Sequence, residues 1–222
     1  MSKGSATIVI LLILTLSLPA GAHDLAKYEF GLWGAMAAVS GDISDDMTGG
    51  GVVGRYRLNS LGEGWLIGVG FDYTTGFGVE DPTGMLCIRR GPSVSVDATD
   101  VDGDGFMISS WIEKRYNEKP QGGLSWFWTA GLGINFVNVD TVRGGTADGG
   151  QFEIETDSGT EFVLSSRAGP RYTFTNNWSA EMGIKLDHHF ADWTVRDRIT
   201  GRSASVDDYT SFGGYIGISY SF

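Results

Sequence analysis

The feature that most constrains the fold is a run of 20 residues without a charged side chain, from Pro120 to Val139. A helix of this length could cross a bilayer, but the run contains a proline, four glycines and two asparagines. It also alternates between Leu124 and Val137, because the even positions are mainly large and apolar and the odd positions mainly small or polar. A period of two predicts a long β-strand with two unlike faces.

The same alternation recurs along the chain and predicts eight strands in all. The weakest is the segment 106–116, where Lys114 falls among the apolar positions and Trp111 among the polar ones. No segment has a competing amphipathic helical pattern. The expected strands are Tyr28–Ser40, Gly51–Leu58, Trp65–Thr74, Phe106–Tyr116, Leu124–Val137, Phe162–Phe174, Trp178–Asp187 and Ser211–Phe222.

The connections between these segments alternate in length. Three are short (59–64, 117–123 and 175–177), and the four between them are longer (41–49, 75–105, 140–158 and 191–208). Tight turns at one end and long loops at the other are typical of an up-and-down barrel. The chain is therefore expected to be all-β, an eight-stranded antiparallel barrel.

Such a barrel can be soluble, with its apolar face inside, or can span a membrane, with its apolar face against lipid. Glycine is frequent on the less apolar face, where it suits a narrow interior better than a solvated surface. Aromatic residues gather near the strand ends, as in membrane barrels. The charges on this face nearly cancel, as a buried set requires, and form a predicted lumen network: Glu29, Arg55, Arg57, Asp72, Glu113, Arg115, Arg167, Arg171, Glu181, Lys185 and Asp187.

Residues 1–22 have the pattern of a cleaved signal peptide. Lys3 precedes the apolar run Ile8–Leu18, and Ala20-Gly21-Ala22 offers a cleavage site. The remaining chain, residues 23–222, is expected to be the barrel domain with a net charge of −12, which argues against a nucleic-acid partner. A single cysteine, Cys87, excludes an intramolecular disulfide framework.

The chain ends with an alternating strand in which Tyr220 lies two residues before the terminal Phe222. This ending resembles the assembly signal of bacterial outer-membrane barrels. With the signal peptide and eight strands, the sequence resembles the small outer-membrane β-barrel family that includes OmpA barrels, OmpX and OmpW. The resemblance implies an outer-membrane location with both termini in the periplasm. It also implies contact with lipid and lipopolysaccharide, and recognition of Tyr220 and Phe222 by the barrel assembly machinery.

Other candidate sites lie in the predicted loops. Asp100, Asp102 and Asp104, followed by Gly105, match the first half of a calcium loop, but Trp111 stands where the final glutamate is needed. They predict a weak divalent-cation site at most, a solvated acidic turn is the alternative, and no other cofactor is expected. Paired arginines at 89–90, and three more at 196, 198 and 202, could meet lipopolysaccharide phosphates or remain solvated.

His188 and His189 are adjacent to Asp187, but no serine follows at a spacing typical of nucleophilic catalysis. They are expected near the outward end of the seventh strand, at the membrane interface or at the base of a loop, and the protein is not expected to be an enzyme. Its filled lumen and acidic outer loops favour surface interaction or envelope integrity. The alternative is a narrow channel for small or hydrophobic solutes, with an opening in the wall beside Pro170. A lipid-modifying hydrolase is a third, weaker hypothesis.

Overall fold

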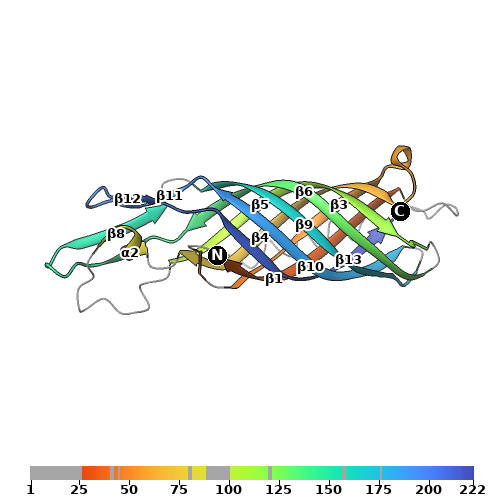
Figure 1. The fold of residues 1–222 in the computed structure, drawn as a ribbon. Helices are drawn as coiled ribbons and strands as arrows, with labels where there is room; N and C mark the ends of the chain where they lie inside the picture. Colours follow the sequence, from red (N-terminus) through yellow and green to blue (C-terminus); the bar gives the residue numbers. More distant parts are fainter. Residues whose placement is uncertain are drawn as a thin grey trace.

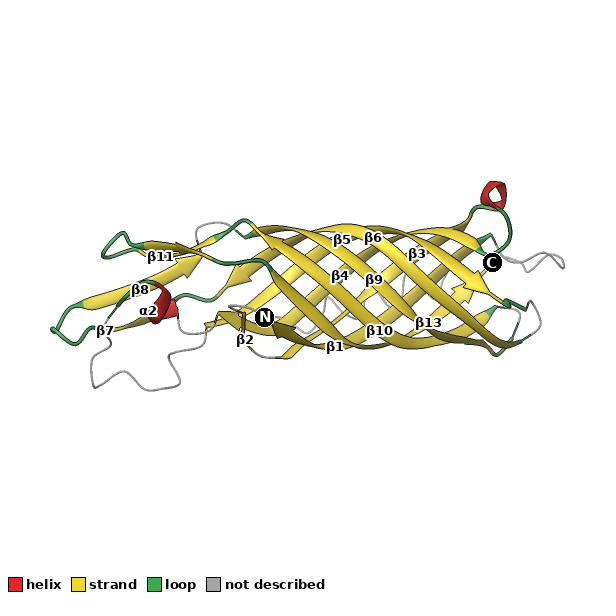
Figure 2. Cartoon of the chain, viewed as in Figure 1, coloured by secondary structure: helices red, strands yellow, loops and turns green. Residues whose placement is uncertain are grey.

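The computed structural model describes residues 27–40, 43–44, 46–79, 82–88, 101–119, 122–156, 159–175 and 177–222. The predicted signal peptide, Arg89, Arg90 and Asp100 lie outside them. Eight long strands form a closed antiparallel barrel, which confirms the expected fold class (Figures 1 and 2). The strands are β1 (Tyr28–Ser40), β3 (Asp46–Arg57), β4 (Trp65–Val79), β5 (Val101–Tyr116), β6 (Gly123–Val139), β9 (Thr160–Thr173), β10 (Trp178–Ala191) and β13 (Tyr209–Ser221).

Every long strand is paired on both sides, so the barrel wall has no free edge. Going round the barrel, β4, β3, β1, β13, β10, β9, β6 and β5 follow one another, and the pairing of β4 with β5 closes the ring. The first and last strands meet, and the backbone groups of Tyr28 and Phe222 exchange hydrogen bonds of 3.2 and 3.0 Å. Closure satisfies the backbone polar groups of every strand, which a hydrocarbon environment demands.

The apolar face of the strands points outward, as the alternation predicts. Leu132, Ile134 and Phe136 of β6 are about half exposed, whereas Asn135 between them is buried. The segment 106–116 keeps the same register despite its mixed pattern, because Trp111 is buried inside and Lys114 lies outside. There the Lys114 ammonium donates to the carbonyl of Glu63 at 2.5 Å. No helix in the described part of the chain is long and apolar enough to cross a bilayer.

Glycines on the inner face make room for Trp111. A Cβ atom at Gly68 would lie 2.3 Å from Cε2 of the indole, and one at Gly131 would lie 2.5 Å from its Cβ. Both positions face Trp111 across neighbouring strands. The two glycines therefore leave the space that the indole ring occupies, as expected in a narrow barrel.

The two ends of the barrel differ. At the turn end, which holds both ends of the described chain, short connections join the strands. At the opposite, loop end, β4 and β5 continue beyond the sequence prediction, and β2 (Ile43–Ser44) pairs with β4. The long loops there are also structured. β7 (Val142–Gly145), β8 (Gln151–Thr156), β11 (Thr194–Asp197) and β12 (Ser203–Ser205) form a second, four-stranded sheet, here called the outer sheet, which sequence analysis did not predict (Figure 1).

The outer sheet packs on a hydrophobic core that it shares with the loop ends of the barrel strands. The short helix α2 (Pro82–Met85) is attached to it, because the Arg202 guanidinium donates to the carbonyls of Leu86 and Cys87 at 3.2 and 2.8 Å. The sheet, the helix segment and the barrel rim thus form one packed unit beyond the barrel. The core consists of Met47, Leu86, Val137, Val139, Phe152, Ile154, Trp193, Val195, Val206 and Tyr209.

Candidate functional site

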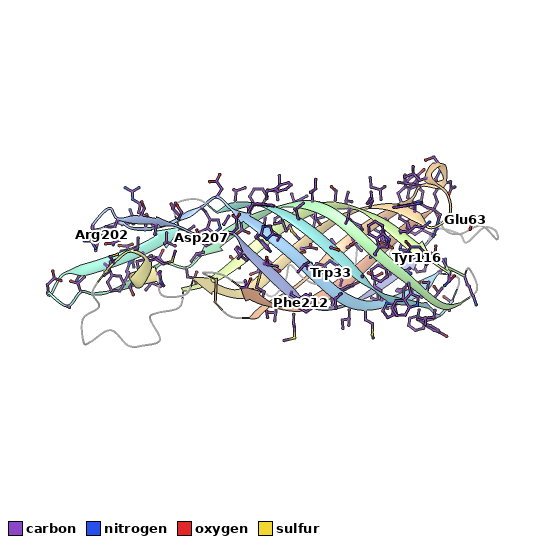
Figure 3. The ribbon with its side chains drawn as sticks, viewed as in Figure 1. Trp33, Glu63, Tyr116, Arg202, Asp207 and Phe212 are labelled. Carbon is purple, nitrogen blue, oxygen red and sulfur yellow. The ribbon has the colours of Figure 1, made fainter. Side chains whose placement is uncertain are left out.

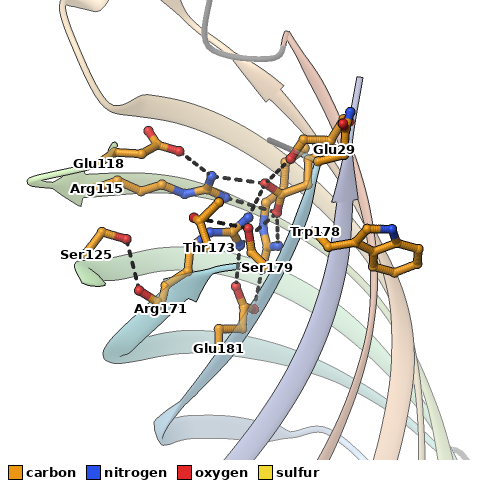
Figure 4. A network of polar contacts seen from close by, with 12 residues as sticks. Glu29, Arg115, Glu118, Ser125, Arg171, Thr173, Trp178, Ser179 and Glu181 are labelled. Carbon is orange, nitrogen blue, oxygen red and sulfur yellow. Dashed lines mark hydrogen bonds and ion pairs between the residues drawn. The ribbon is translucent and has the colours of Figure 1, made fainter. Parts of the chain in front are cut away.

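The lumen of the barrel contains three layers of polar and aromatic side chains. The layer at the turn end is centred on Glu29, a buried residue near the start of β1 (Figure 4). Its carboxylate accepts hydrogen bonds from Arg55 at 2.5 Å, from Arg115 at 3.0 Å and from Arg171 at 2.7 Å. These arginines come from β3, β5 and β9, so the carboxylate links strands from different sides of the barrel.

Three further glutamates complete this layer. Arg55 also pairs with Glu113 at 2.9 Å and with Glu181 at 2.6 Å. Glu118, which sequence analysis missed because it belongs to a turn, pairs with Arg57 at 2.9 Å and with Arg115 at 3.0 Å. Four arginines therefore face four glutamates in one layer, which we call the turn-end network: Glu29, Arg55, Arg57, Glu113, Arg115, Glu118, Arg171 and Glu181.

The middle layer combines cations with aromatic rings. The Arg167 guanidinium lies 4.5 Å from the ring centre of Trp33 and 5.3 Å from that of Trp111, and it pairs with Asp72 at 3.5 Å. Lys185 pairs with Asp187 and lies 5.1 Å from Trp33. Cation–π contacts are strongest where water is excluded, and this layer is buried.

The layer nearest the loop end was not predicted. It surrounds Glu161, whose carboxylate accepts hydrogen bonds from Asn135, Trp193 and Tyr209 at 2.8 to 3.0 Å. His189 Nδ1 lies 2.9 Å from the same carboxylate. His189 lies near the loop end of β10, as the sequence predicts, but its side chain is on the lumen face rather than at the membrane interface or in the loop.

A small cavity lies between the middle layer and the Glu161 layer. Its volume is about 30 Å³, and Asn135, Asp187 and His189 contribute to its walls together with Met47 and Met107. A cavity of this size holds roughly two water molecules. The described lumen therefore combines packed layers with a small cavity whose walls are mainly apolar.

The other candidate residues lie apart from the lumen. His188 faces outward, with Nδ1 3.0 Å from the Thr210 hydroxyl. Asp104 lies in β5, and its carboxylate accepts a hydrogen bond from Tyr73 at 2.9 Å. Asp102 belongs to the same strand. Among the residues that the structure describes, no three His, Cys, Asp or Glu side chains form a metal-binding group.

The wall beside Pro170 is continuous in register. Regular bridges between β9 and β10 stop at Arg171 and resume at Ala168 with unchanged pairing. Proline has no amide hydrogen to donate, which accounts for the interruption. The strands still touch there, because a Cβ atom at Gly169 would lie 2.0 Å from the carbonyl oxygen of Met182.

Within the outer sheet, Asp197 forms several hydrogen bonds that stabilise the neighbouring backbone. Its carboxylate accepts hydrogen bonds from the backbone of Glu153, Ile199 and Thr200 and from the Thr200 hydroxyl. Burial raises the pKa of Asp197, but these hydrogen bonds, led by that of the Thr200 hydroxyl, hold it below its usual value. The exposed face nearby carries Arg143 and Arg198, both of which pair with Glu153.

Solved structures with the same architecture come from bacterial outer membranes. No protein-family model and no curated protein matches the chain. The crystal structure of Neisserial surface protein A superposes with a TM-score of 0.54 at 14% identity, covering 88% of this chain and 97% of that one. This chain has the fold of the small outer-membrane β-barrels. The outer membrane protein OprG from Pseudomonas aeruginosa is also similar, with a TM-score of 0.51 at 11% identity, covering 90% of this chain and 98% of that one.

Tyr220 and Phe222 lie on the outside of the barrel, at the turn end. The ring of Phe222 stacks on Phe30 with centres 5.7 Å apart and on Tyr28 with centres 6.0 Å apart, and Tyr220 packs against Trp178. The other aromatic rings at this end include Tyr116, which is labelled in Figure 3. The terminal residues therefore belong to an aromatic band of the kind found at membrane interfaces.

Proposed function

We propose that the protein is a non-conducting, non-enzymatic barrel of the bacterial outer membrane that displays the outer sheet at the cell surface, with both termini in the periplasm. The observation that carries the proposal is the turn-end network, in which buried side chains from five of the eight barrel strands meet across the lumen. Ion flow would have to break several buried charge-assisted hydrogen bonds at once, and each of these is costly to break.

The outer sheet supports a role in surface interaction. A loop that only joins strands needs no hydrophobic core, yet here ten buried apolar side chains fix the loop end. A rigid platform loses less entropy on binding than a mobile loop would. Its exposed arginines 143, 196, 198 and 202 would suit lipopolysaccharide phosphates or another anionic surface partner.

The arrangement of the histidines supports the absence of enzymatic activity. Nucleophilic catalysis of this kind needs one histidine that hydrogen-bonds to a hydroxyl through one ring nitrogen and to an acidic side chain through the other. Here His189 contacts the carboxylate of Glu161 on the inner face of β10, whereas His188 contacts the hydroxyl of Thr210 on the outer face. The two halves of such a site therefore lie on opposite sides of the barrel wall.

Conductance across a planar bilayer tests the proposal. The refolded chain without residues 1–22 should insert without current steps, and its insertion is verified separately by protection of the strands from protease. The double variant Arg171→Ala with Glu181→Ala removes one arginine and one glutamate, keeps the lumen charge, and should produce small steps. Steps of equal size in both proteins would refute a closed lumen and favour the second candidate, a narrow channel for small solutes.

A further inference from the structure

Lys114 is the charged residue that interrupts the apolar outer face of the segment 106–116. Its neighbours on that face are aromatic, because it pairs in register with Trp65 of β4 and with Trp128 of β6, and Tyr116 follows two positions later. The ammonium lies 5.1 Å from the ring centre of Trp65 and 5.8 Å from that of Tyr116. A cation at these distances is attracted by the faces of both rings.

The aromatic side chains around Lys114 also contact one another. The rings of Trp65 and Trp128 meet edge to face with centres 6.0 Å apart, and Trp128 Nε1 donates to the Tyr116 hydroxyl at 3.0 Å. On the turn side, the ammonium donates to the backbone carbonyl of Glu63 at 2.5 Å. These contacts position the ammonium on the outer surface of the barrel, in what we call the Lys114 cluster: Trp65, Lys114, Tyr116 and Trp128.

The positive charge of Lys114 has no anionic partner in the part of the chain that the structure describes. Glu63 accepts through its backbone carbonyl, and no carboxylate forms an ion pair with the ammonium. An ammonium has three N–H donors, of which this carbonyl takes one. Lys114 is half-buried, so a group from outside the chain is needed to satisfy its charge and its remaining donors.

The cluster lies where phosphate groups of a membrane are expected. Tyr116 and Glu63 are both at the turn end of the barrel (Figure 3), in the aromatic band. Such bands lie at the level of the lipid headgroups. A second cation at this end, Lys27, lies just before β1 and 5.4 Å from the ring centre of Tyr56, and it adds positive charge to the same rim.

We propose that the Lys114 cluster binds the headgroup of a net-anionic phospholipid, of the phosphatidylglycerol class, in the leaflet that faces the turn end. The ammonium would donate charge-assisted hydrogen bonds to the phosphate. A choline lipid carries its own cation, which would compete with Lys114 both for the phosphate and for the faces of the aromatic rings. This inference rests on the membrane location in the proposed function.

The test uses the refolded chain without residues 1–22 in a neutral detergent, and native mass spectrometry counts the lipids that stay bound. Phosphatidylglycerol and phosphatidylcholine with the same acyl chains are titrated separately, since both have a phosphate but only the first has a net charge. The unsubstituted protein should bind phosphatidylglycerol about fivefold more tightly, as one basic residue at an anionic lipid surface provides. Lys114→Gln keeps a donor for the Glu63 carbonyl but should lose this preference, whereas Lys114→Arg should keep it.

The matched control is Lys119→Gln, which removes an exposed lysine from the turn after β5 and should bind like the unsubstituted protein. The circular dichroism of each variant reports its fold. Equal affinities for the two lipids, or an equal loss in Lys114→Gln and Lys119→Gln, would overturn the proposal. The conductance of the barrel does not depend on Lys114, so current steps would refute the closed lumen and leave this lipid site in place.

Discussion

Glu29→Gln is the sharpest test of the buried network. The Glu29 side chain is 4% exposed and contacts three guanidinium groups at 2.5 to 3.0 Å. The amide keeps the shape of the carboxylate but removes its charge, so the three arginines lose a shared anion. Removing one partner of a buried ion pair costs about 3–5 kcal/mol, and we expect the free energy of unfolding to fall by that amount.

The assay is reversible urea unfolding in lipid vesicles, followed by tryptophan fluorescence. The matched control is Glu153→Gln in the outer sheet, which removes a carboxylate from the ion pair with the exposed Arg143. Exposed pairs contribute at most about 1 kcal/mol, so the control should change little. If Glu29→Gln costs no more than Glu153→Gln, the lumen is hydrated and the argument for a closed barrel fails.

Three further predictions concern the wall, the outer sheet and assembly. Ile184→Arg places a charge on the outer face and should destabilise the inserted barrel by about 2–4 kcal/mol in the same urea assay; an unchanged midpoint would mean that this face does not contact lipid. Because the pKa of Asp197 is lowered, its stabilisation of the outer sheet is complete above about pH 4 and is lost as the pH falls through the lowered value. The protection of β8 and β11 from hydrogen exchange, relative to the intrinsic exchange rate at each pH, should therefore fall on acidification, and Asp197→Asn should abolish that fall. Deletion of Phe222 should slow insertion into vesicles that contain the assembly machinery, and an unchanged rate would contradict the proposed signal.

The barrel was predictable because lipid and lumen impose opposite requirements on successive residues. The alternation located all eight long strands, including β5 with its misplaced Lys114. It underestimated the length of β4 and β5 at the loop end, where the register of β4 shifts between Thr75 and Phe77 and β5 begins with aspartate and glycine residues that do not alternate with apolar ones. It also missed the outer sheet, whose strands are short and whose central pairing joins Ile154 of β8 to Asp197 of β11, far apart in the sequence.

The Glu161 layer was missed for a simpler reason. The alternation was followed only from Phe162 and only as far as Asp187, so Glu161 and His189, at the loop-end limits of the two strands, were not assigned to a face. In both strands the odd-numbered residues face the lumen. Extending the alternation by one or two residues would therefore have placed Glu161 and His189 inside. Their hydrogen bonds to Trp193 and Tyr209 could not be predicted, because those contacts depend on how the loop end packs.

Spin labels at successive positions of β6 test the central claim most directly. Single cysteines on a Cys87→Ser background, at Leu132, Ile134, Asn135, Phe136 and Val137, carry the label in lipid vesicles, and the accessibility to dissolved oxygen is measured; Gly133 is left out because no Cβ atom fits there. The account predicts a period of two, with maxima at Leu132, Ile134 and Phe136, which face outward. Maxima at the odd positions, or a period near 3.6 residues, would contradict a membrane barrel with a polar, filled lumen.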